Sequence, residues 1–463
     1  FLHAEFGKDD EVTYIKVKQD IATLWCELDP TATPFIDGKG ELILELDRFI
    51  YGLKQSPLKF QLHLTAVLAG IGYKKMANDE CMFVKHKGKE YSILTVHVDD
   101  ILQISTLGEM YDELEQGLKN AYGSITTHKE ATAYLGMALE RSACLGYVKV
   151  TQQGLIQKLV EQHPNEQGDQ KRYTTPAEEE IFDERAGLKS RVLDATERSE
   201  YQGLIMTLMY LARLSRPDVL LPVTYLASRS HISTERDYQH VIRIVHYLEN
   251  TMDTGMILHC KDLSLTIHCD ASHLLHKQAG KGHSGYYVSL GSTGSYLHGR
   301  SAKQKLTANS STEAEILAAL DAVKFALWMR NLLAELQITP LLQMTLLQDN
   351  KSAMMIEANP SNKRTAHLTS KLRFVEEQIS GGALKTQHVP TADLSADLLT
   401  KPLQGSQYLK HSDQLLGKRW LRKFGSQHAA VKVVQKVRGR AVPLHDAHRV
   451  KVSRLYRCES RRW

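Results

Sequence analysis

Residues 93–102, with the sequence ILTVHVDDIL, constrain the fold more than any other stretch of the chain. Apolar β-forming residues run up to Asp99 and Asp100 and resume directly after them, a pattern that predicts two strands joined by a tight turn. Two neighbouring carboxylates at the tip of a buried hairpin repel each other unless a positive charge lies close to both. A divalent cation can supply that charge. The alternative is a plain solvated turn, because Asp is common in turns.

Composition places the chain among ordinary globular proteins. It has 463 residues, 42% hydrophobic and 24% charged, which is enough for several domains. No apolar run approaches the about 20 residues of a membrane span, and no secretory signal opens the chain, so neither a membrane nor secretion is expected. Six scattered cysteines without a CxxC pair predict neither a zinc site nor a disulfide framework, and indicate a reducing compartment.

The charge is unevenly distributed along the chain. Residues 417–463 carry fourteen Lys and Arg against two acidic residues, a net of +12, whereas the whole chain is +5, so the first 416 residues carry a net −7. This basic tail could neutralise phosphates non-specifically. The alternative is translated sequence without a selected role.

Periodicity and turn signals predict a mixed α and β protein. The elements expected before residue 260 are strands at 12–17, 41–46, 81–85, 134–139 and 146–151, and helices at 58–69, 107–122, 153–163, 201–214 and 237–248. After residue 260 we expect strands at 263–270, 285–290, 294–299, 343–349 and 384–389, and helices at 311–336, 351–358, 367–379 and 392–399.

An ordered series of motifs resembles a known family. FLHAEF (1–6), YGLKQSP (51–57), HVDD (97–100), YLG (134–136), VTQQGLIQKL (150–159), YTTP (173–176) and LMYLARLSRPDV (208–219) resemble the reverse transcriptase of copia-type LTR retrotransposons. HCDAS (268–272), SSTEAE (310–315), QDNKSA (348–353) and ADLLTKP (396–402) resemble the ribonuclease H domain fused behind it. The similarity covers roughly residues 1–405.

For the polymerase, the resemblance implies two Mg²⁺ (or Mn²⁺) ions held by three aspartates. Asp99 matches a direct ligand and Asp100 a supporting one. The third aspartate is expected five residues before Phe1, and Glu5, Asp9 and Asp10 are poor substitutes. Because an anionic ligand would be missing, we expect residues 1–463 alone to be an impaired polymerase.

Four residues match the family's nucleotide and template contacts. Phe1 corresponds to the aromatic under the incoming sugar, or it is an ordinary core residue. Gly52, Ser56 and Pro57 correspond to the floor under template and nucleotide, and Ser56 and Pro57 also suit a helix start. His97 replaces a tyrosine and is expected to be a packing neighbour.

For the nuclease, the resemblance implies four acids around two divalent cations: Asp270 at a strand end, Glu313 in the first turn of a helix, Asp349 at a strand end and Asp397 on a short helix. Four carboxylates in one pocket are unstable without countercharge.

Each of these acids except Asp270 has a local alternative. Glu313 could be the third residue of a capping box with Ser310, and Asp349 could belong to a turn. Asp393 is a rival to Asp397. His388 could shuttle protons, although a histidine at a strand end is more often structural.

The resulting prediction is a multidomain α+β and α/β protein. Its expected parts are a polymerase palm without fingers (1–125), a thumb and connection (126–260), a ribonuclease H-like mixed-sheet domain (261–405) and the basic tail (406–463). Lys149, Lys158, Lys171, Arg172, Arg213 and Arg216 are candidate phosphate contacts.

The resemblance implies an enzyme acting on an RNA template, a DNA primer, dNTPs and RNA·DNA hybrids. It also implies a place in cytoplasmic virus-like particles with possible nuclear entry. The alternatives are a catalytically dead relic and a host-adopted nucleic-acid-binding protein.

Overall fold

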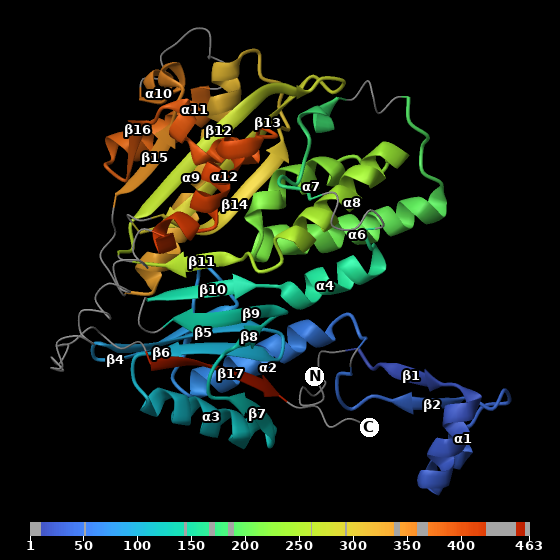
Figure 1. The fold of residues 1–463 in the computed structure, drawn as a ribbon. Coiled ribbons are helices and arrows are strands. Elements are labelled where there is room, and N and C mark those ends of the chain that lie inside the picture. The colour runs from blue at the N-terminus through green and yellow to red at the C-terminus, as the bar shows by residue number, and fades with distance from the viewer. Residues whose placement is uncertain are drawn as a thin grey trace, which may run out of the picture. The chain divides into compact units, whose positions relative to one another are not determined.

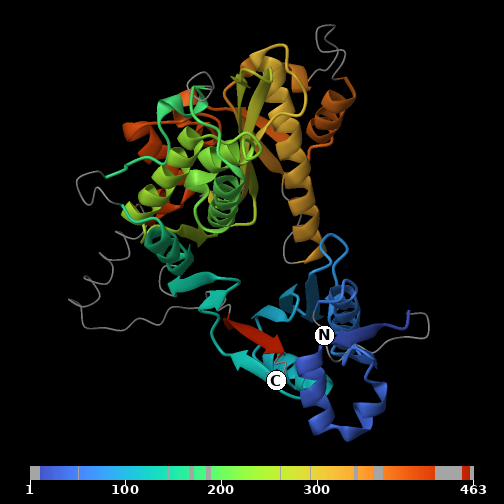
Figure 2. The same cartoon turned by 90° about the vertical axis from the view of Figure 1, so that its right-hand side faces the viewer.

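The computed structural model describes residues 11–50, 52–142, 146–165, 172–183, 189–260, 262–291, 294–337, 343–358, 369–422 and 451–458. The chain divides into two compact units (Figures 1 and 2). The first comprises residues 1–131 with 445–463, and the second comprises residues 132–444.

The first unit is built on a six-stranded sheet. Its strand order is β3 (Lys74–Lys75), β4 (Met82–Lys87), β5 (Glu90–His97), β6 (Asp100–Ser105), β17 (Lys451–Cys458) and β7 (Ile125–His128). Helices α2 (Ser56–Gly70) and α3 (Glu109–Tyr122) bury apolar side chains in one core with β4, β5 and β6. Because alternate residues of a strand face one side, Ser92, Leu94 and Val96 of β5 are all buried.

A second, smaller group of elements precedes α2. Strands β1 (Tyr14–Val17) and β2 (Leu42–Glu45) form where the sequence predicts strands, and they pair antiparallel. Between them lie α1 (Gln19–Leu28) and the 3₁₀ helix η1 (Pro30–Phe35), neither of which was predicted. Ala22, Ala32 and Leu42 form their small core.

The second unit begins with a four-stranded sheet and a helical layer. The sheet has the order β11 (Met256–His259), β10 (Tyr147–Thr151), β9 (Met137–Ser142) and β8 (Ala133–Tyr134). The helices are α4 (Gln153–Gln162), α6 (Ala195–Leu214), α7 (Leu220–Ala227) and α8 (Glu235–Asn250), with 3₁₀ helices η3 (Glu179–Phe182) and η4 (Pro217–Val219). Capping boxes formed by Asp194 and Thr234 fix where α6 and α8 begin.

A five-stranded mixed sheet follows in the same unit. Its order is β14 (Ser295–Lys303), β13 (Lys281–Leu290), β12 (Leu265–His276), β15 (Met344–Gln348) and β16 (Leu384–His388). Strands β12, β13 and β14 are antiparallel, whereas β15 and β16 run parallel to β12. Helix α9 (Ser311–Glu335) packs on β12 and β13, and α10 (Lys351–Ala358) and α11 (Thr369–Ser380) follow in turn.

The chain order of these elements matches the order expected for a ribonuclease H-like domain. Two details differ from the prediction. The short helix expected at 392–399 consists of two 3₁₀ helices, η6 (Thr391–Asp393) and η7 (Ser395–Leu399), and an unpredicted helix α12 (Gly405–Leu415) comes after them.

One of the hydrophobic cores of the second unit extends from its helical part to the segments around the mixed sheet. It joins Val150, Leu211 and Val245 of the helical part to Leu399 and Leu415 from beyond the mixed sheet. The unit boundary at 131/132 lies close to the predicted one at 125/126. The predicted divisions at 260 and 405 stay predictions, and this core extends across both.

Candidate metal centre and polymerase hairpin

Three aspartates come together beside the neighbouring strands β12 and β15 of the mixed sheet. Asp270 lies on β12, Asp349 follows β15 directly, and Asp397 lies in η7. Each offers an oxygen, and these oxygens all lie within 4.8 Å of one another. The parallel register pairs His268 with Leu347, and continuing it by two residues brings Asp270 level with Asp349. The sequence placed Asp270 at a strand end, but β12 continues to His276.

A glycine lets the chain segment that carries Asp397 approach the sheet. Gly285 of β13 pairs with Asp270 in the ladder. A Cβ atom at Gly285 would lie 2.6 Å from Thr400 Cγ2 and 2.8 Å from Leu399 Cβ, which is too close for ordinary contact. The missing side chain therefore allows Thr400 to reach Asp270, whose Oδ2 accepts a hydrogen bond from the Thr400 hydroxyl.

The glutamate in this site is Glu315, which corrects the prediction of Glu313. The carboxylate of Glu313 accepts hydrogen bonds from the Asn309 backbone N–H at 2.8 Å and from Asn309 Nδ2 at 3.1 Å, at the start of α9. Its own N–H donates to Ser310 Oγ at 3.2 Å, as expected of a helix-capping residue. Glu315 instead lines the cavity that contains Asp270 and Asp349.

Helical periodicity contained the signal that identifies Glu315. Residues three, four, seven and eleven positions after Glu315 are alanines, at 318, 319, 322 and 326, and all four are fully buried. Residues at these spacings share one helix face, so the face that packs on the sheet begins with Glu315. Small alanines also allow α9 to lie close to β12.

The electrostatics of the site are those of crowded carboxylates. Burial, together with Asp270 and Asp349, raises the pKa of Glu315 to about 9. Burial and Asp270 likewise raise the pKa of Asp397 to about 7. The Oε2 atom of Glu315 is buried without a hydrogen-bond partner. Such a set of hard oxygen donors suits a divalent cation of the Mg²⁺ or Mn²⁺ type.

One side chain already supplies positive charge. Lys401 Nζ lies 2.9 Å from Asp397 Oδ1 and 3.4 Å from Asp270 Oδ1. Although burial disfavours its charged form, Asp270 and Asp397 together raise the pKa of the Lys401 ammonium. Lys401 is therefore a fixed cation inside the acidic cluster.

Asp270, Glu315 and Asp349 face a cavity of about 540 Å³. Its other lining residues include Asn350, Lys351, Ser352 and His388. Thr391 Oγ1 donates to Asp349 Oδ2 at 2.7 Å and so orients this carboxylate. Asp393, the rival to Asp397, is exposed and pairs with Lys410 at 2.7 Å. His388 lies at the end of β16 with an exposed side chain, so its role stays a prediction.

The predicted hairpin in the first unit is confirmed. Strands β5 and β6 pair antiparallel with His97 opposite Asp100, which leaves Val98 and Asp99 as a two-residue turn. Val98 has a φ of 56°, unusual for a β-branched residue and therefore a sign of local strain. Among the described residues, no third acidic, histidine or cysteine side chain completes a cluster with Asp99 and Asp100.

The expected nucleotide contacts are placed only in part. Phe1 lies outside the described residues. Gly52 has a φ of +98°, a conformation that favours glycine. Gln55 rather than Ser56 is the N-cap of α2, and the buried Ser56 donates its hydroxyl to Ile50 O at 2.6 Å. Pro57 lies in the first turn, as predicted.

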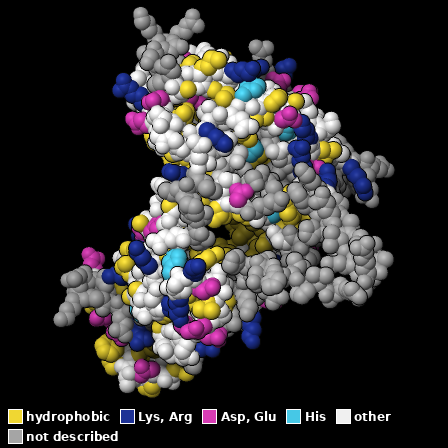
Figure 3. Space-filling model, turned by 90° about the vertical axis from the view of Figure 1, so that its left-hand side faces the viewer, with side chains coloured by type: hydrophobic (Ala, Val, Ile, Leu, Met, Phe, Trp, Pro, Cys, Tyr) yellow, Lys and Arg dark blue, Asp and Glu magenta, His cyan; other side chains and the backbone are white. Residues whose placement is uncertain are grey.

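The prediction that Arg216 contacts phosphate is wrong. Its side chain is fully buried, and its guanidinium donates to both carboxylate oxygens of Asp218 at 2.8 and 2.9 Å. Lys149 Nζ lies 3.8 Å from Glu140 Oε2. Lys171 is outside the described residues. On the face drawn in Figure 3, Lys and Arg side chains are interspersed with Asp and Glu.

No helix of the described part is long and apolar enough to span a bilayer.

Comparison with known proteins bears on both parts of the chain. Residues 17–179, which include the β5–β6 hairpin, match the family "Reverse transcriptase (RNA-dependent DNA polymerase)". The retrovirus-related Pol polyprotein from transposon RE1 of Arabidopsis thaliana is 30% identical over 385 residues, which is 82% of this chain and 25% of the relative. The corresponding polyprotein from transposon TNT 1-94 of Nicotiana tabacum is 23% identical over 377 residues, 81% of this chain and 28% of the relative.

A solved structure of a foamy viral protease–reverse transcriptase in complex with an RNA/DNA hybrid aligns with 77% of this chain and 40% of its own, at 15% identity and a TM-score of 0.41. The chain spans about a quarter of the length of these two plant polyproteins. Taken with the ordered motifs, the sequence matches show that the chain is a member of the copia-type retrotransposon Pol polyproteins.

Proposed function

We propose that the second unit is a ribonuclease H that cleaves the RNA strand of RNA·DNA hybrids. The observation that carries the proposal is the approach of Asp270, Asp349 and Asp397 to within 4.8 Å of one another. Glu315 lines the same cavity with a strongly raised pKa, which is typical of groups held for metal binding or proton transfer.

Each side chain has a distinct task in this proposal. Asp270, Glu315, Asp349 and Asp397 would hold the divalent cations, Mg²⁺ or Mn²⁺. Thr400 and Thr391 orient Asp270 and Asp349 through their hydroxyl donors, so these carboxylates keep one rotamer before metal binds. When bound, a pair of such ions makes water more nucleophilic and stabilises the departing 3′-oxygen.

A cleavage assay on a labelled RNA·DNA hybrid in Mg²⁺ tests the proposal. The wild-type chain is expected to shorten the RNA strand, and Asp270→Asn is expected to reduce the rate by at least about a hundredfold. Equal cleavage rates for wild type and Asp270→Asn would reject the proposed nuclease activity. The remaining alternatives would then be a catalytically dead relic and a host-adopted nucleic-acid-binding protein.

We further propose that the β5–β6 hairpin serves RNA-directed DNA synthesis from an RNA template, a DNA primer and dNTPs. Support comes from the family match across residues 17–179 and from the tight turn that presents Asp99 beside Asp100. Primer extension should be lost in Asp99→Asn and reduced less in Asp100→Asn. Virus-like particles are the proposed site of action.

A further inference from the structure

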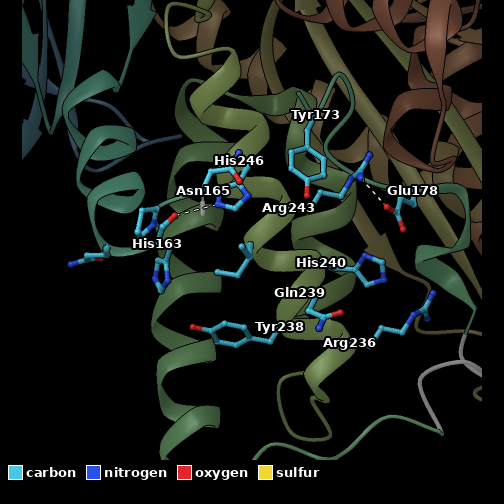
Figure 4. A pocket seen from close by; sticks show the side chains of 13 residues that line it. His163, Asn165, Tyr173, Glu178, Arg236, Tyr238, Gln239, His240, Arg243 and His246 are labelled. Carbon is cyan, nitrogen blue, oxygen red and sulfur yellow. Dashed lines mark hydrogen bonds and ion pairs between the residues drawn. The ribbon is translucent and has the colours of Figure 1, made fainter. Parts of the chain in front are cut away.

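A cavity of about 750 Å³ lies in the helical part of the second unit. Its wall consists of one face of α8, the C-terminal end of α4 and two nearby segments that contribute Asn165, Tyr173 and Glu178 (Figure 4). It shares no lining residue with the carboxylate cavity. The volume falls within the usual range for small-molecule sites.

A buried histidine in this wall has an unused polar atom. His240 is 7% exposed, and its Nε2 has no hydrogen-bond partner. Burial lowers the pKa of this imidazole, which favours its neutral form. An unpaired polar atom costs stability when it is buried. A ligand in the cavity would supply the missing partner.

The wall also carries an uncompensated positive charge. Arg243 is neutralised by Glu178, whose Oε1 lies 2.8 Å from Arg243 Nη1. Arg236 donates only to the carbonyls of Asp183 and Glu180, both at 2.9 Å, and makes no ion pair with the described residues. A guanidinium held in place by carbonyls keeps further N–H donors for an anion, and phosphate is an anion that Arg binds well.

Flat rings and amides complete the wall. The ring centroids of Tyr173 and His246 lie 5.9 Å apart, and their ring planes are inclined by 30°. The Arg243 guanidinium lies over the Tyr173 ring, 4.7 Å from its centroid. Tyr238 adds a further ring, and Gln239 and Asn165 bring side-chain amides to the wall (Figure 4). Rings of this kind stack on nucleic-acid bases, and amides can bond to base edges.

The sequence produces this arrangement through one helix. Arg236, His240 and Arg243 follow a spacing of four and three residues, so they lie on one face of α8. Gln239 and His246 follow the same periodicity on the adjoining strip. The apolar positions between them, such as Val241 and Ile244, are buried in the core.

We propose that this cavity binds one nucleotide of a single-stranded nucleic acid, with its phosphate at Arg236 and its base against the rings and His240. The proposal goes beyond the nuclease and the polymerase because none of the residues involved belongs to either acidic site.

Calorimetric titration of the whole chain in EDTA tests it. EDTA removes divalent cations and so suppresses binding at both acidic sites. AMP and the trinucleotide ApApA are expected to bind, with ApApA at least as tight as AMP. Adenosine and inorganic phosphate should each bind at least about tenfold more weakly than AMP, because each lacks half of the recognised group.

Matched variants locate the site. Arg236→Gln should lower the affinity for AMP at least about tenfold, since a charge-assisted contact with the phosphate is lost. Gln239→Ala, at an exposed position of α8, should weaken AMP binding less. Arg300→Gln, at an exposed arginine outside the cavity, should leave affinity unchanged.

Three results would overturn the proposal. They are equal AMP affinity in wild type and both cavity variants, phosphate binding as tight as AMP, or exclusion of ApApA while AMP binds. Circular dichroism of each variant shows whether a loss of binding reflects a loss of fold. Hybrid cleavage measured in parallel keeps this outcome separate from that of the nuclease.

Discussion

Lys401 Nζ lies 2.9 Å from Asp397 Oδ1, in the middle of the carboxylate cluster. A divalent cation bound by the same acids would meet this ammonium at close range and be repelled by it. The lysine therefore stabilises the metal-free site and opposes metal binding.

Lys401→Met should accordingly bind metal at least about tenfold more tightly than wild type, measured by Tb³⁺ luminescence and competition with Mg²⁺. In EDTA the same variant should unfold at a lower temperature, because the buried acids lose their countercharge. Lys410→Met, which removes an exposed pair with Asp393, is the matched control and should change neither quantity. Unchanged metal affinity in Lys401→Met would refute this role.

Two glutamates in one turn of α9 provide an internal comparison. Glu315→Gln should abolish metal-dependent cleavage and weaken metal binding, because it removes an anionic ligand from the cavity. Glu313→Gln should retain cleavage and lower the free energy of unfolding by about 1 kcal/mol, since its carboxylate accepts hydrogen bonds from Asn309 at the start of the helix. If Glu313→Gln lost cleavage while Glu315→Gln kept it, the assignment of Glu315 would be wrong.

The raised pKa of Glu315 predicts a pH dependence of stability in EDTA. A carboxyl with a folded-state pKa of about 9 keeps its proton where the unfolded chain has lost it. Its contribution to stability is therefore present at low pH and is lost as pH rises through about 9. The free energy of unfolding should fall between pH 6 and 9, by no more than about 1.4 kcal/mol per pH unit for this group.

Urea unfolding at several pH values measures that slope, and Glu315→Gln should flatten it. Saturating Mg²⁺ should reverse its sign, because the cation binds only ionised carboxylates. A slope that is the same in Glu315→Gln and wild type would contradict the prediction.

The buried pair of Arg216 and Asp218 predicts a large effect on stability. Asp218 also accepts from the Tyr247 hydroxyl at 2.7 Å, and Tyr408 donates to Tyr247 at 2.8 Å. Asp218→Asn would leave a buried guanidinium without its counterion, so the free energy of unfolding should fall by about 3–5 kcal/mol. Breaking the exposed pair of Arg300 and Asp321 by Asp321→Asn should cost less than about 1 kcal/mol. Similar losses in both variants would show that the buried network is not the cause.

Much of the fold could be predicted from local sequence patterns. The hairpin at Asp99 and Asp100, helix α2 after Ser56 and the alternation of strands and helices from β12 to β16 all follow from periodicity and turn residues. Helix α7 was not predicted because nearly all of its own residues are apolar, so they show no amphipathic period, and because Pro222 lies within it. Strand β17 was missed because its pairing with β6 depends on residues far apart in the chain.

The metal centre could be predicted only in part. Asp270, Asp349 and Asp397 come together as the predicted order of strands and helices indicates, although Asp270 lies within β12 and not at its end. The motif SSTEAE predicts Glu313, but its second glutamate, Glu315, is the one that lines the cavity. Both are buried, and only their contacts separate them, because the Glu313 carboxylate accepts hydrogen bonds from Asn309. Lys401 could not be assigned from sequence, since its position depends on the close approach that Gly285 allows.

The core shared by the helical part and the mixed sheet has a consequence for recombination between related retrotransposons. Leu399 belongs to the same core as Val150 and Val245, so a recombination event that replaced only residues 261–405 would pair core residues of one element with those of another. Nuclease segments of this type should therefore exchange between elements together with the helices that precede them, as one evolutionary block.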